Sequence, residues 1–250
     1  MVLKPADSRA VFRVSGSDRV DFLQGLVTND VARLSDGLVY SALLSPQGKY
    51  LADFFLVPGD SAILLDVKTE LAGGLVKRLN LYRLRADVQI EETGIQVVRG
   101  LGTGPNGSFP DPRHPALGWR FFGDGVASDN VDWDAIRVEH CIPESGVELI
   151  PDETYILEAG FERLNGVDFR KGCYVGQEIV ARMKHKTELR KGLARVAVEG
   201  SAPVGTAILA GGKPAGMLFS QSGGHGIAHL RFDRTKGAMT AGQARVTRLT

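Results

Sequence analysis

Two apolar segments joined by a short turn constrain the fold of this chain more than any other feature. Leu38–Leu44 and Tyr50–Val57 have the composition of strands, and Ser45-Pro46-Gln47-Gly48 between them is rich in turn-forming residues. The pair predicts an antiparallel hairpin, and Ala62–Val67 predicts a third strand after a second turn. Helices are expected at Asp18–Leu26 and Thr69–Leu79. Because tight turns join the strands, the pattern favours an α+β fold over a βαβ series.

The pattern of apolar segments and turn residues changes near Arg195. From there on, short apolar segments are separated by Gly and Pro turns, which predicts a small all-β barrel or sandwich. Gly100–Pro115 is expected to be a surface loop or linker, and Arg137–Ile142 a short strand. We therefore expect an N-terminal α+β subdomain (residues 1–100), a second α+β part intertwined with it (residues 101–192) and a C-terminal β-barrel (residues 193–250).

Composition excludes several classes of protein. The net charge of +1 gives no reason to expect direct nucleic-acid binding, and no segment approaches 18 consecutive apolar residues. Met1–Asp7 has no apolar signal region. We therefore expect a cytoplasmic monomer without a membrane span. Cys141 and Cys173 are the two cysteines, and without a C-x-x-C motif they predict no metal site of the chain's own.

Cys173 is the residue best placed for chemistry. Gly172 and Gly176 bracket it, and a helix is expected to begin near Gln177. A helix N-terminus favours a thiolate, and Arg170 and Lys171 add positive charge nearby in the sequence. These features predict a reactive cysteine. The alternative is a small buried apolar residue, which is the usual role of an unpaired cysteine.

The segment around Cys173 resembles a family signature. It reads K-G-C-Y-V-G-Q-E, and its seven fixed positions are Lys171, Gly172, Cys173, Tyr174, Gly176, Gln177 and Glu178. This is similar to the K-G-C-Y-x-G-Q-E signature of the YgfZ branch of the GcvT-like family. Further blocks that resemble the family occur in the same order, at residues 22–30, 42–53, 81–85, 142–146 and 157–160. The resemblance implies a fold shared with the glycine-cleavage T-protein, with three subdomains in a cloverleaf, antiparallel sheets and a small C-terminal β-barrel.

The resemblance also implies a tetrahydrofolate site. Glu158, in the L-E-A-G segment, corresponds to a glutamate that binds the pterin ring, and a carboxylate suits the paired N–H groups of an aminopyrimidine. Asp53 lies in the block that places an aspartate near the reacting nitrogen of folate. Tyr82 and Tyr174 are candidates for an aromatic wall or for plain core packing.

Positive charge gathers around the signature. Residues 160–195 hold nine basic and four acidic side chains, a local charge of +5. Arg182, Lys184 and Arg190 in this stretch are candidates for binding the glutamate tail of folate or an acidic partner protein. The alternative is a solvated helix face.

The family resemblance implies an accessory factor that binds tetrahydrofolate and assists the assembly or repair of iron–sulfur proteins, especially 4Fe–4S proteins, through Cys173. One thiolate cannot hold a cluster that needs about four ligands, so a partner would supply the others. The expected partner is an A-type scaffold or an iron–sulfur enzyme. The main alternative is a folate-dependent aminomethyltransferase of the T-protein type, against which the cysteine signature argues. A third possibility is a folate-binding module that serves tRNA-modifying or radical enzymes.

Overall fold

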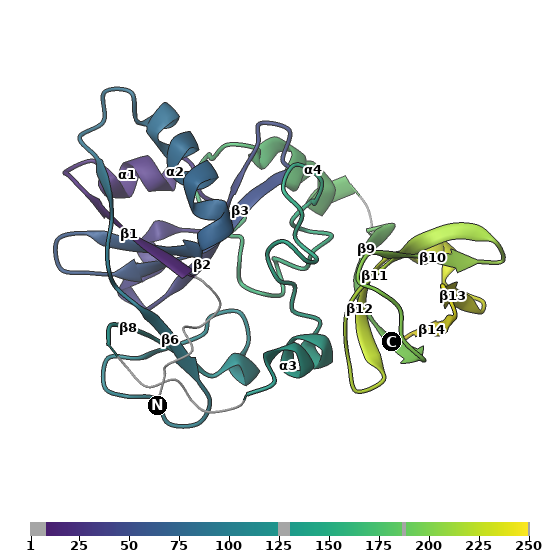
Figure 1. Cartoon of the computed structure of the whole chain (residues 1–250). Coiled ribbons are helices and arrows are strands. Elements are labelled where there is room, and N and C mark those ends of the chain that lie inside the picture. Colours follow the sequence, from purple (N-terminus) through teal and green to yellow (C-terminus); the bar gives the residue numbers. More distant parts are fainter. Residues whose placement is uncertain (1–8, 125–130, 187–188, 250) are drawn as a thin grey trace. The chain divides into compact units, whose positions relative to one another are not determined.

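The structure is a computed structural model that describes residues 9–124, 131–186 and 189–249 (Figure 1). Contacts divide the chain into two compact units. Unit 1 contains residues 1–131 and 162–179, and unit 2 contains residues 132–161 and 180–250. The three-part division expected from the sequence stays a prediction. The N-terminal segment Met1–Asp7, the side chain of Lys186 and Glu188 lie outside the described residues.

A five-stranded antiparallel sheet forms the centre of unit 1, in the order β2-β3-β4-β1-β5. Its strands are β1 (Arg9–Ser15), β2 (Val39–Leu44), β3 (Tyr50–Pro58), β4 (Ile63–Lys68) and β5 (Gln89–Glu92). The predicted hairpin is confirmed: β2 pairs with β3 from Val39 opposite Leu56 to Leu44 opposite Tyr50. The third predicted strand is confirmed as β4.

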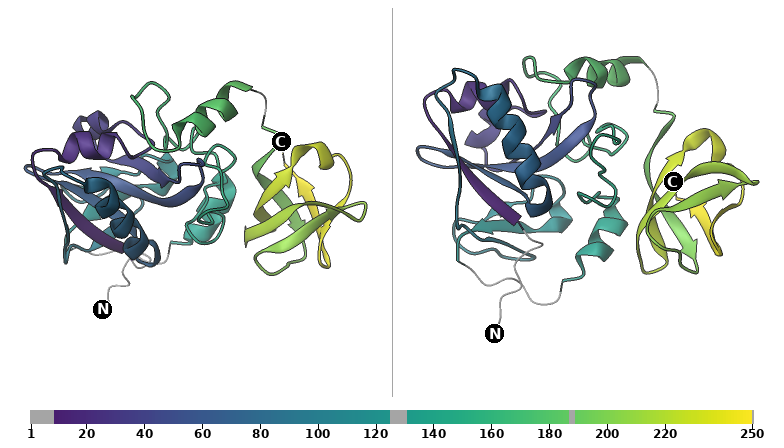
Figure 2. Two further views of the ribbon diagram at one scale, coloured as in Figure 1. Left: turned by 90° about the horizontal axis from the view of Figure 1, so that it is seen from above. Right: turned by 45° about the horizontal axis from the view of Figure 1, so that its top comes forward.

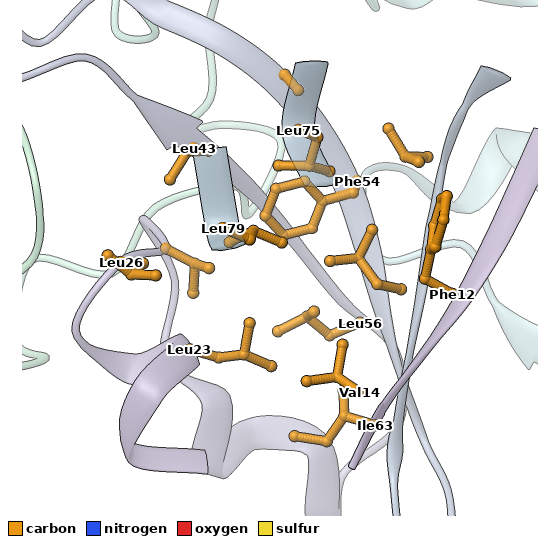
Figure 3. Packing of buried hydrophobic residues seen from close by; sticks show 14 of the residues in the cluster. Phe12, Val14, Leu23, Leu26, Leu43, Phe54, Leu56, Ile63, Leu75 and Leu79 are labelled. Atoms are coloured by element: carbon orange, nitrogen blue, oxygen red, sulfur yellow. The ribbon is translucent and has the colours of Figure 1, made fainter. Parts of the chain in front are cut away.

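Helices cover one face of this sheet (Figure 1). They are α1 (Arg19–Gln24), the 3-10 turn η1 (Val31–Ser35) and α2 (Thr69–Arg83). Leu23 of α1 and Leu75 and Leu79 of α2 pack on Phe54 and Leu56 of β3, as Figure 3 shows. Both predicted helices are therefore present, although α1 is shorter and α2 longer than expected from the sequence. Burial of their apolar faces holds them in place.

The opposite face of the sheet carries a buried ion-pair network. A three-stranded sheet in the order β6-β8-β7 contributes to it, with β6 (Val97–Gly100), β7 (Phe109–Pro110), the turn η2 (Pro115–Leu117) and β8 (Trp119–Phe122). Arg120 of β8 binds Asp66 of β4 at 3.2 Å and Asp111 at 3.0 Å, and its guanidinium lies 3.9 Å from the centre of the Phe55 ring. Gly100–Pro115 lies wholly within unit 1 and is exposed or half-buried, with Gly100, Asp111 and Arg113 as its buried exceptions. The expected surface loop is therefore confirmed, and its alternative as a linker between subdomains is wrong.

Unit 2 combines a helix with the C-terminal barrel. The barrel is closed, in the order β10-β11-β12-β9-β14-β13, which confirms the sequence prediction (Figure 2). Its elements are β9 (Lys191–Glu199), β10 (Thr206–Ala210), β11 (Lys213–Ser222), β12 (His225–Arg231), η3 (Phe232–Arg234), β13 (Met239–Ala241) and β14 (Ala244–Arg248). The strand expected at Arg137–Ile142 is wrong, because these residues mostly form the helix α3 (Trp133–His140).

A buried arginine fixes α3 to the barrel. Arg137 donates to the Glu148 carboxylate at 3.1 Å and to the Ser220 hydroxyl of β11 at 2.8 Å. The Glu148 side chain is fully buried, so it needs this cation. The last helix, α4 (Gln177–Lys186), confirms the helix expected after the signature, and it spans the division between the two units. The α+β class with antiparallel sheets and a C-terminal β-barrel is thus confirmed. None of the helices described is both long and apolar enough to cross a bilayer.

Candidate functional site

Cys173 lies on an exposed loop just before α4. Its thiol is free and its side chain is exposed, so it is not a buried apolar residue. The neighbouring Gly172 is exposed as well, and a Cβ added there would meet no atom within 4 Å. Nothing in the described structure covers this part of the loop. Cys173 is thus accessible to a partner or a reagent.

Lys171 anchors the loop through its buried side chain. Its Nζ donates to the backbone carbonyls of Gln24 at 2.8 Å and Asn29 at 3.0 Å, and also to that of Val27. Burial lowers the pKa of Lys171 to about 8, although Asp30 and Asp168 act in the opposite direction. The ammonium is thus directed at the backbone of residues 24–29, and its effect on the thiol of Cys173 stays a prediction. The lysine holds the loop in place.

Tyr174 completes this anchor. The tyrosine is buried, with 7% of its surface exposed, and burial raises its pKa to about 12. The Lys171 ammonium lies 5.2 Å from the centre of its ring, a cation–π contact. Tyr82 lies on α2 and is 37% exposed. The described contacts do not bring the two tyrosines together, so the aromatic wall proposed for them stays a prediction.

The second half of the signature packs on the hairpin turn. Gly176 has a φ of +84°, and a Cβ there would lie 2.6 Å from the carbonyl oxygen of Ser45. Gly48 has a φ of +72°, and its Cβ would lie 2.7 Å from the Cβ of Ile179. Both positions therefore need glycine. The two sequence blocks meet in space, and the turn sets where α4 begins. Of the remaining signature residues, Gln177 is half-buried and Glu178 is exposed.

The Thr28-Asn29-Asp30 block fixes the chain that leads into the signature. The Thr28 hydroxyl donates to the Gly166 carbonyl at 2.7 Å, and the Asn29 amide donates to the Asn165 carbonyl at 2.7 Å. The Asp168 N–H donates to the Thr28 carbonyl at 3.1 Å. Thr28 and Asn29 are buried, so these bonds are shielded from water. Residues 165–174 are thereby held at several points, with Cys173 left outside.

Asp53 lies inside unit 1. Its carboxylate accepts hydrogen bonds from the Tyr50 hydroxyl at 2.6 Å and the Tyr40 hydroxyl at 3.0 Å, and the residue is 5% exposed. Burial, followed by the nearby Asp53 charge, raises the pKa of Tyr40. Asp53 is thus a buried acceptor on β3, with both carboxylate oxygens already bonded.

Glu158 lines a pocket in unit 2. Its Oε2 lies 3.1 Å from His229 Nε2 and 3.5 Å from Lys191 Nζ. Oε1 has no partner among the described residues. The backbone also holds Glu158, because its carbonyl accepts from Leu193 N–H at 2.7 Å. The pocket has a volume of about 220 Å³, and Ile150, Leu193, Met217 and Phe219 supply apolar surface. Nothing in the sequence pointed to His229, which lies 71 positions from Glu158.

The basic candidates are all exposed. Arg182 and Lys184 are both exposed on α4, but residues two apart point to different sides of a helix. Arg190 is exposed in the segment between α4 and β9. Within the described residues, no group of three or more His, Cys, Asp or Glu side chains is arranged to hold a metal ion.

Comparison with known proteins identifies relatives of the whole chain. Residues 190–249 match the family described as CAF17, C-terminal beta-barrel domain. The chain is 31% identical to the mitochondrial iron–sulfur cluster assembly factor IBA57 of Mus musculus and 30% identical to that of Homo sapiens. Each alignment covers 93% of this chain and 78% of the relative. Both relatives are named as mitochondrial, so the cytoplasmic location expected from the sequence is contradicted.

A solved structure shows the same fold. The aminomethyltransferase T of the glycine cleavage system from Bartonella henselae superposes with a TM-score of 0.74 over 98% of this chain and 83% of its own. Sequence identity is 13%, so the likeness concerns the fold alone. It confirms the GcvT-like fold predicted from the sequence blocks.

Proposed function

Because the chain belongs to the IBA57 family of iron–sulfur cluster assembly factors, we propose that it assists the assembly or repair of iron–sulfur proteins, above all those with 4Fe–4S clusters. The observation that carries the proposal is the exposed Cys173 on a loop fixed by Lys171 and the Thr28–Asn29 block. A rigid loop with an exposed thiol suits contact with a second protein, because little ordering entropy is lost on binding.

Cys173 would work together with ligands from a partner. A cluster requires about four ligands, and the described residues hold no group of three or more His, Cys, Asp or Glu side chains that could bind a metal ion. The partner is thus a protein that carries a cluster or awaits one, such as an A-type scaffold or the client enzyme. In either case Cys173 contributes one thiolate, and the partner contributes the remaining ligands.

Tetrahydrofolate, or a derivative of it, is the proposed ligand of the Glu158 pocket. Oε1 of Glu158 is available to accept an N–H group of an aminopyrimidine, while His229 and Lys191 hold Oε2. Met217 and Phe219 in the lining suit a flat heteroaromatic ring. The residues present therefore fit the group. When bound, tetrahydrofolate would supply a carrier of one-carbon units, while Glu158 would orient its ring.

The assembly role is tested in cells that lack this protein. We expect the activity of a 4Fe–4S enzyme to fall and to return when the wild-type chain is expressed. A 2Fe–2S enzyme and an enzyme without a cluster serve as controls, and both should change much less. Unchanged 4Fe–4S activity in the absence of the protein would contradict the proposal.

Folate binding is tested by titrating the purified chain with 5-formyltetrahydrofolate and following the heat of binding. Glu158→Gln keeps the shape of the side chain but removes its charge, and should weaken binding about 10- to 100-fold, since hydrogen bonds to charged groups contribute roughly 1.5–3 kcal/mol. Glu199→Gln is the matched control, because Glu199 is an exposed glutamate of the same unit. Equal affinities of wild type and Glu158→Gln would remove Glu158 from the site.

A folate-dependent aminomethyltransferase is the second candidate, favoured by the fold it shares with the Bartonella henselae enzyme. The burial of Asp53 between Tyr40 and Tyr50 argues against it, because both oxygens of the expected acid are already bonded. Incubation with tetrahydrofolate and an aminomethyl-loaded carrier protein decides between the two. Turnover would make the chain an enzyme, and its absence at high protein concentration would leave the accessory role.

A further inference from the structure

The end of α2 exposes apolar side chains that the core does not use. Leu81 is 67% exposed and Leu84 is 89% exposed, and Tyr82 between them is 37% exposed. The other apolar residues of α2 behave differently: Ala72, Leu75 and Leu79 are buried against the sheet. In Figure 1 the chain leaves α2 as a loop at the edge of unit 1. Two large exposed leucines this close together are unusual on a surface that only meets water.

Leu84 is also held in a strained conformation. Its φ is +44°, a region that a branched side chain rarely adopts. The loop after it is anchored on the start of α1: the Asp87 carbonyl accepts from Asp18 N–H at 3.2 Å, and the Asp87 carboxylate accepts from the Ser17 hydroxyl at 2.8 Å. These bonds fix the chain three residues after Leu84, whose side chain is exposed. Strain of this kind persists where the surroundings impose it.

The outer face of α2 leaves room for another chain. Gly73 and Gly74 lie in the middle of the helix, where glycine weakens helical structure. A Cβ added at either position would meet no atom within 4 Å, and neither has a positive φ. No described contact therefore requires glycine there. Together they leave a stretch of backbone without side chains about two turns before Leu81.

Exposed basic residues lie within four positions of Leu81 along the chain. Lys77, Arg78 and Arg85 are exposed and have no ion pair within the described part of the chain. Glu70 is the acidic residue of α2, and it lies in the first turn, 3.9 Å from Lys68. The surface is therefore positive where it is apolar. Arg and Tyr are the residues that most often anchor protein interfaces.

We infer that this surface, made of Lys77, Arg78, Leu81, Tyr82, Leu84 and Arg85, docks an acidic segment of a partner protein whose apolar side chains cover Leu81 and Leu84. Charge complementarity favours the acidic partner. A protein fits better than a membrane, because the rest of the apolar face of α2 is turned to the core and two leucines give little area for a bilayer. The inference is independent of the role of Cys173 and of the folate pocket.

Photocrosslinking in cells tests this docking surface. Leu84 of the full chain is replaced by p-benzoylphenylalanine, and adducts are compared among three versions that carry it. We expect an adduct with an acidic protein in the otherwise wild-type chain and in Arg78→Lys/Arg85→Lys. The adduct should fall about tenfold in Arg78→Glu/Arg85→Glu, as for the loss of an interface anchor. The alkylation rate of Cys173 and the melting temperature confirm that each version is folded.

Four results would overturn the inference. They are an adduct with a second copy of this chain, an adduct with lipid, an adduct that survives charge reversal unchanged, and the absence of any adduct. A second variant guards against misfolding: Leu84→Gly relieves the strained φ, so it should not lower the melting temperature. In cells that lack this protein, wild type is expected to restore the activity of a 4Fe–4S enzyme. Lower restored activity with Leu84→Gly than with wild type would connect the surface to the proposed function.

Discussion

Replacing Lys171 by methionine removes the anchor of the signature loop. Three hydrogen bonds from a charged donor contribute roughly 1.5–3 kcal/mol each, about 4.5–9 kcal/mol together. Burying the charge opposes this. The pKa falls from 10.5 to about 8, a difference of 2.5 that costs about 3 kcal/mol at 1.36 kcal/mol per pKa unit. The net contribution is therefore about 1–6 kcal/mol. Methionine fills the same space, so we expect a loss in the lower half of this range, about 3 kcal/mol.

Differential scanning calorimetry measures the effect. For a unit of this size, 1 kcal/mol corresponds to about 2–4 °C, so the transition of unit 1 should fall by about 6–12 °C in Lys171→Met. Lys77→Met is the matched control, since Lys77 is exposed and has no described ion pair, and it should change the transition little. Equal transitions for wild type and Lys171→Met would refute the anchoring role.

The pH dependence gives an independent check on Lys171. Because its folded pKa of about 8 lies below the unfolded value of 10.5, the unfolded chain binds the proton more tightly between these values. The free energy of unfolding of the wild type therefore rises with pH in this window. Lys171→Met has no lysine at this position, so its stability lacks this pH-dependent contribution. From pH 7 to pH 9 the gap between the two should widen by about 1.3 kcal/mol, or about 3–5 °C. A gap that narrows toward pH 9 would contradict the stated burial of the charge.

Two further substitutions test the packing of each unit. Gly176→Ala should destabilise unit 1 by about 2–4 kcal/mol, because it combines a positive φ with a backbone clash. Gly172→Ala, in the open loop, should cost under ~1 kcal/mol. Chemical denaturation measures the free energy of unfolding of both variants. Arg137→Met should destabilise unit 2 by about 3–5 kcal/mol, because it leaves the buried Glu148 carboxylate without its cation. Arg195 is more exposed, so Arg195→Met should cost under ~1 kcal/mol. Thermal melting compares the two variants, and similar losses of stability would contradict a stabilising role of the buried ion pair.

Local patterns in the sequence predicted much of the fold. The hairpin followed from two apolar segments and the turn at Ser45–Gly48, and the barrel followed from short segments between Gly and Pro turns. Both features are local, so neighbouring residues suffice to indicate them. Arg137–Ile142 was wrong for a related reason. Its apolar residues suit a strand, but the buried contacts of Arg137 with Glu148 and Ser220 accompany a helix packed on the barrel.

The sequence alone did not show which way the side chains of Lys171 and Asp53 point. Lys171 lies two residues from Cys173, which suggested charge beside the thiol, yet its ammonium turns inward to carbonyls more than 140 positions away. Asp53 belongs to a block with a family role, but only the register of β2 against β3 reveals that Tyr40 and Tyr50 bond its carboxylate. Long-range pairing decides such contacts, and one sequence alone does not record it.

The candidate site shows the same limit. The family signature indicated Cys173, and the structure leaves that thiol exposed. The partners of Glu158 are different: Lys191 and His229 come from two strands of the barrel, β9 and β12, and no short motif joins them to the L-E-A-G segment. The antiparallel pairing of β9 with β12 places Lys191 and His229 next to each other, and both side chains reach the Glu158 carboxylate.

The most direct test of the account concerns the thiol itself. In cells that lack this protein, the activity of a 4Fe–4S enzyme is compared after expression of wild type, Cys173→Ala and Cys141→Ala at equal levels. Cys141 caps α3 and is the matched control for loss of a cysteine. The account predicts rescue by wild type and Cys141→Ala and none by Cys173→Ala. Equal rescue by Cys173→Ala would contradict the central claim that the exposed thiol of the signature loop performs the chemistry.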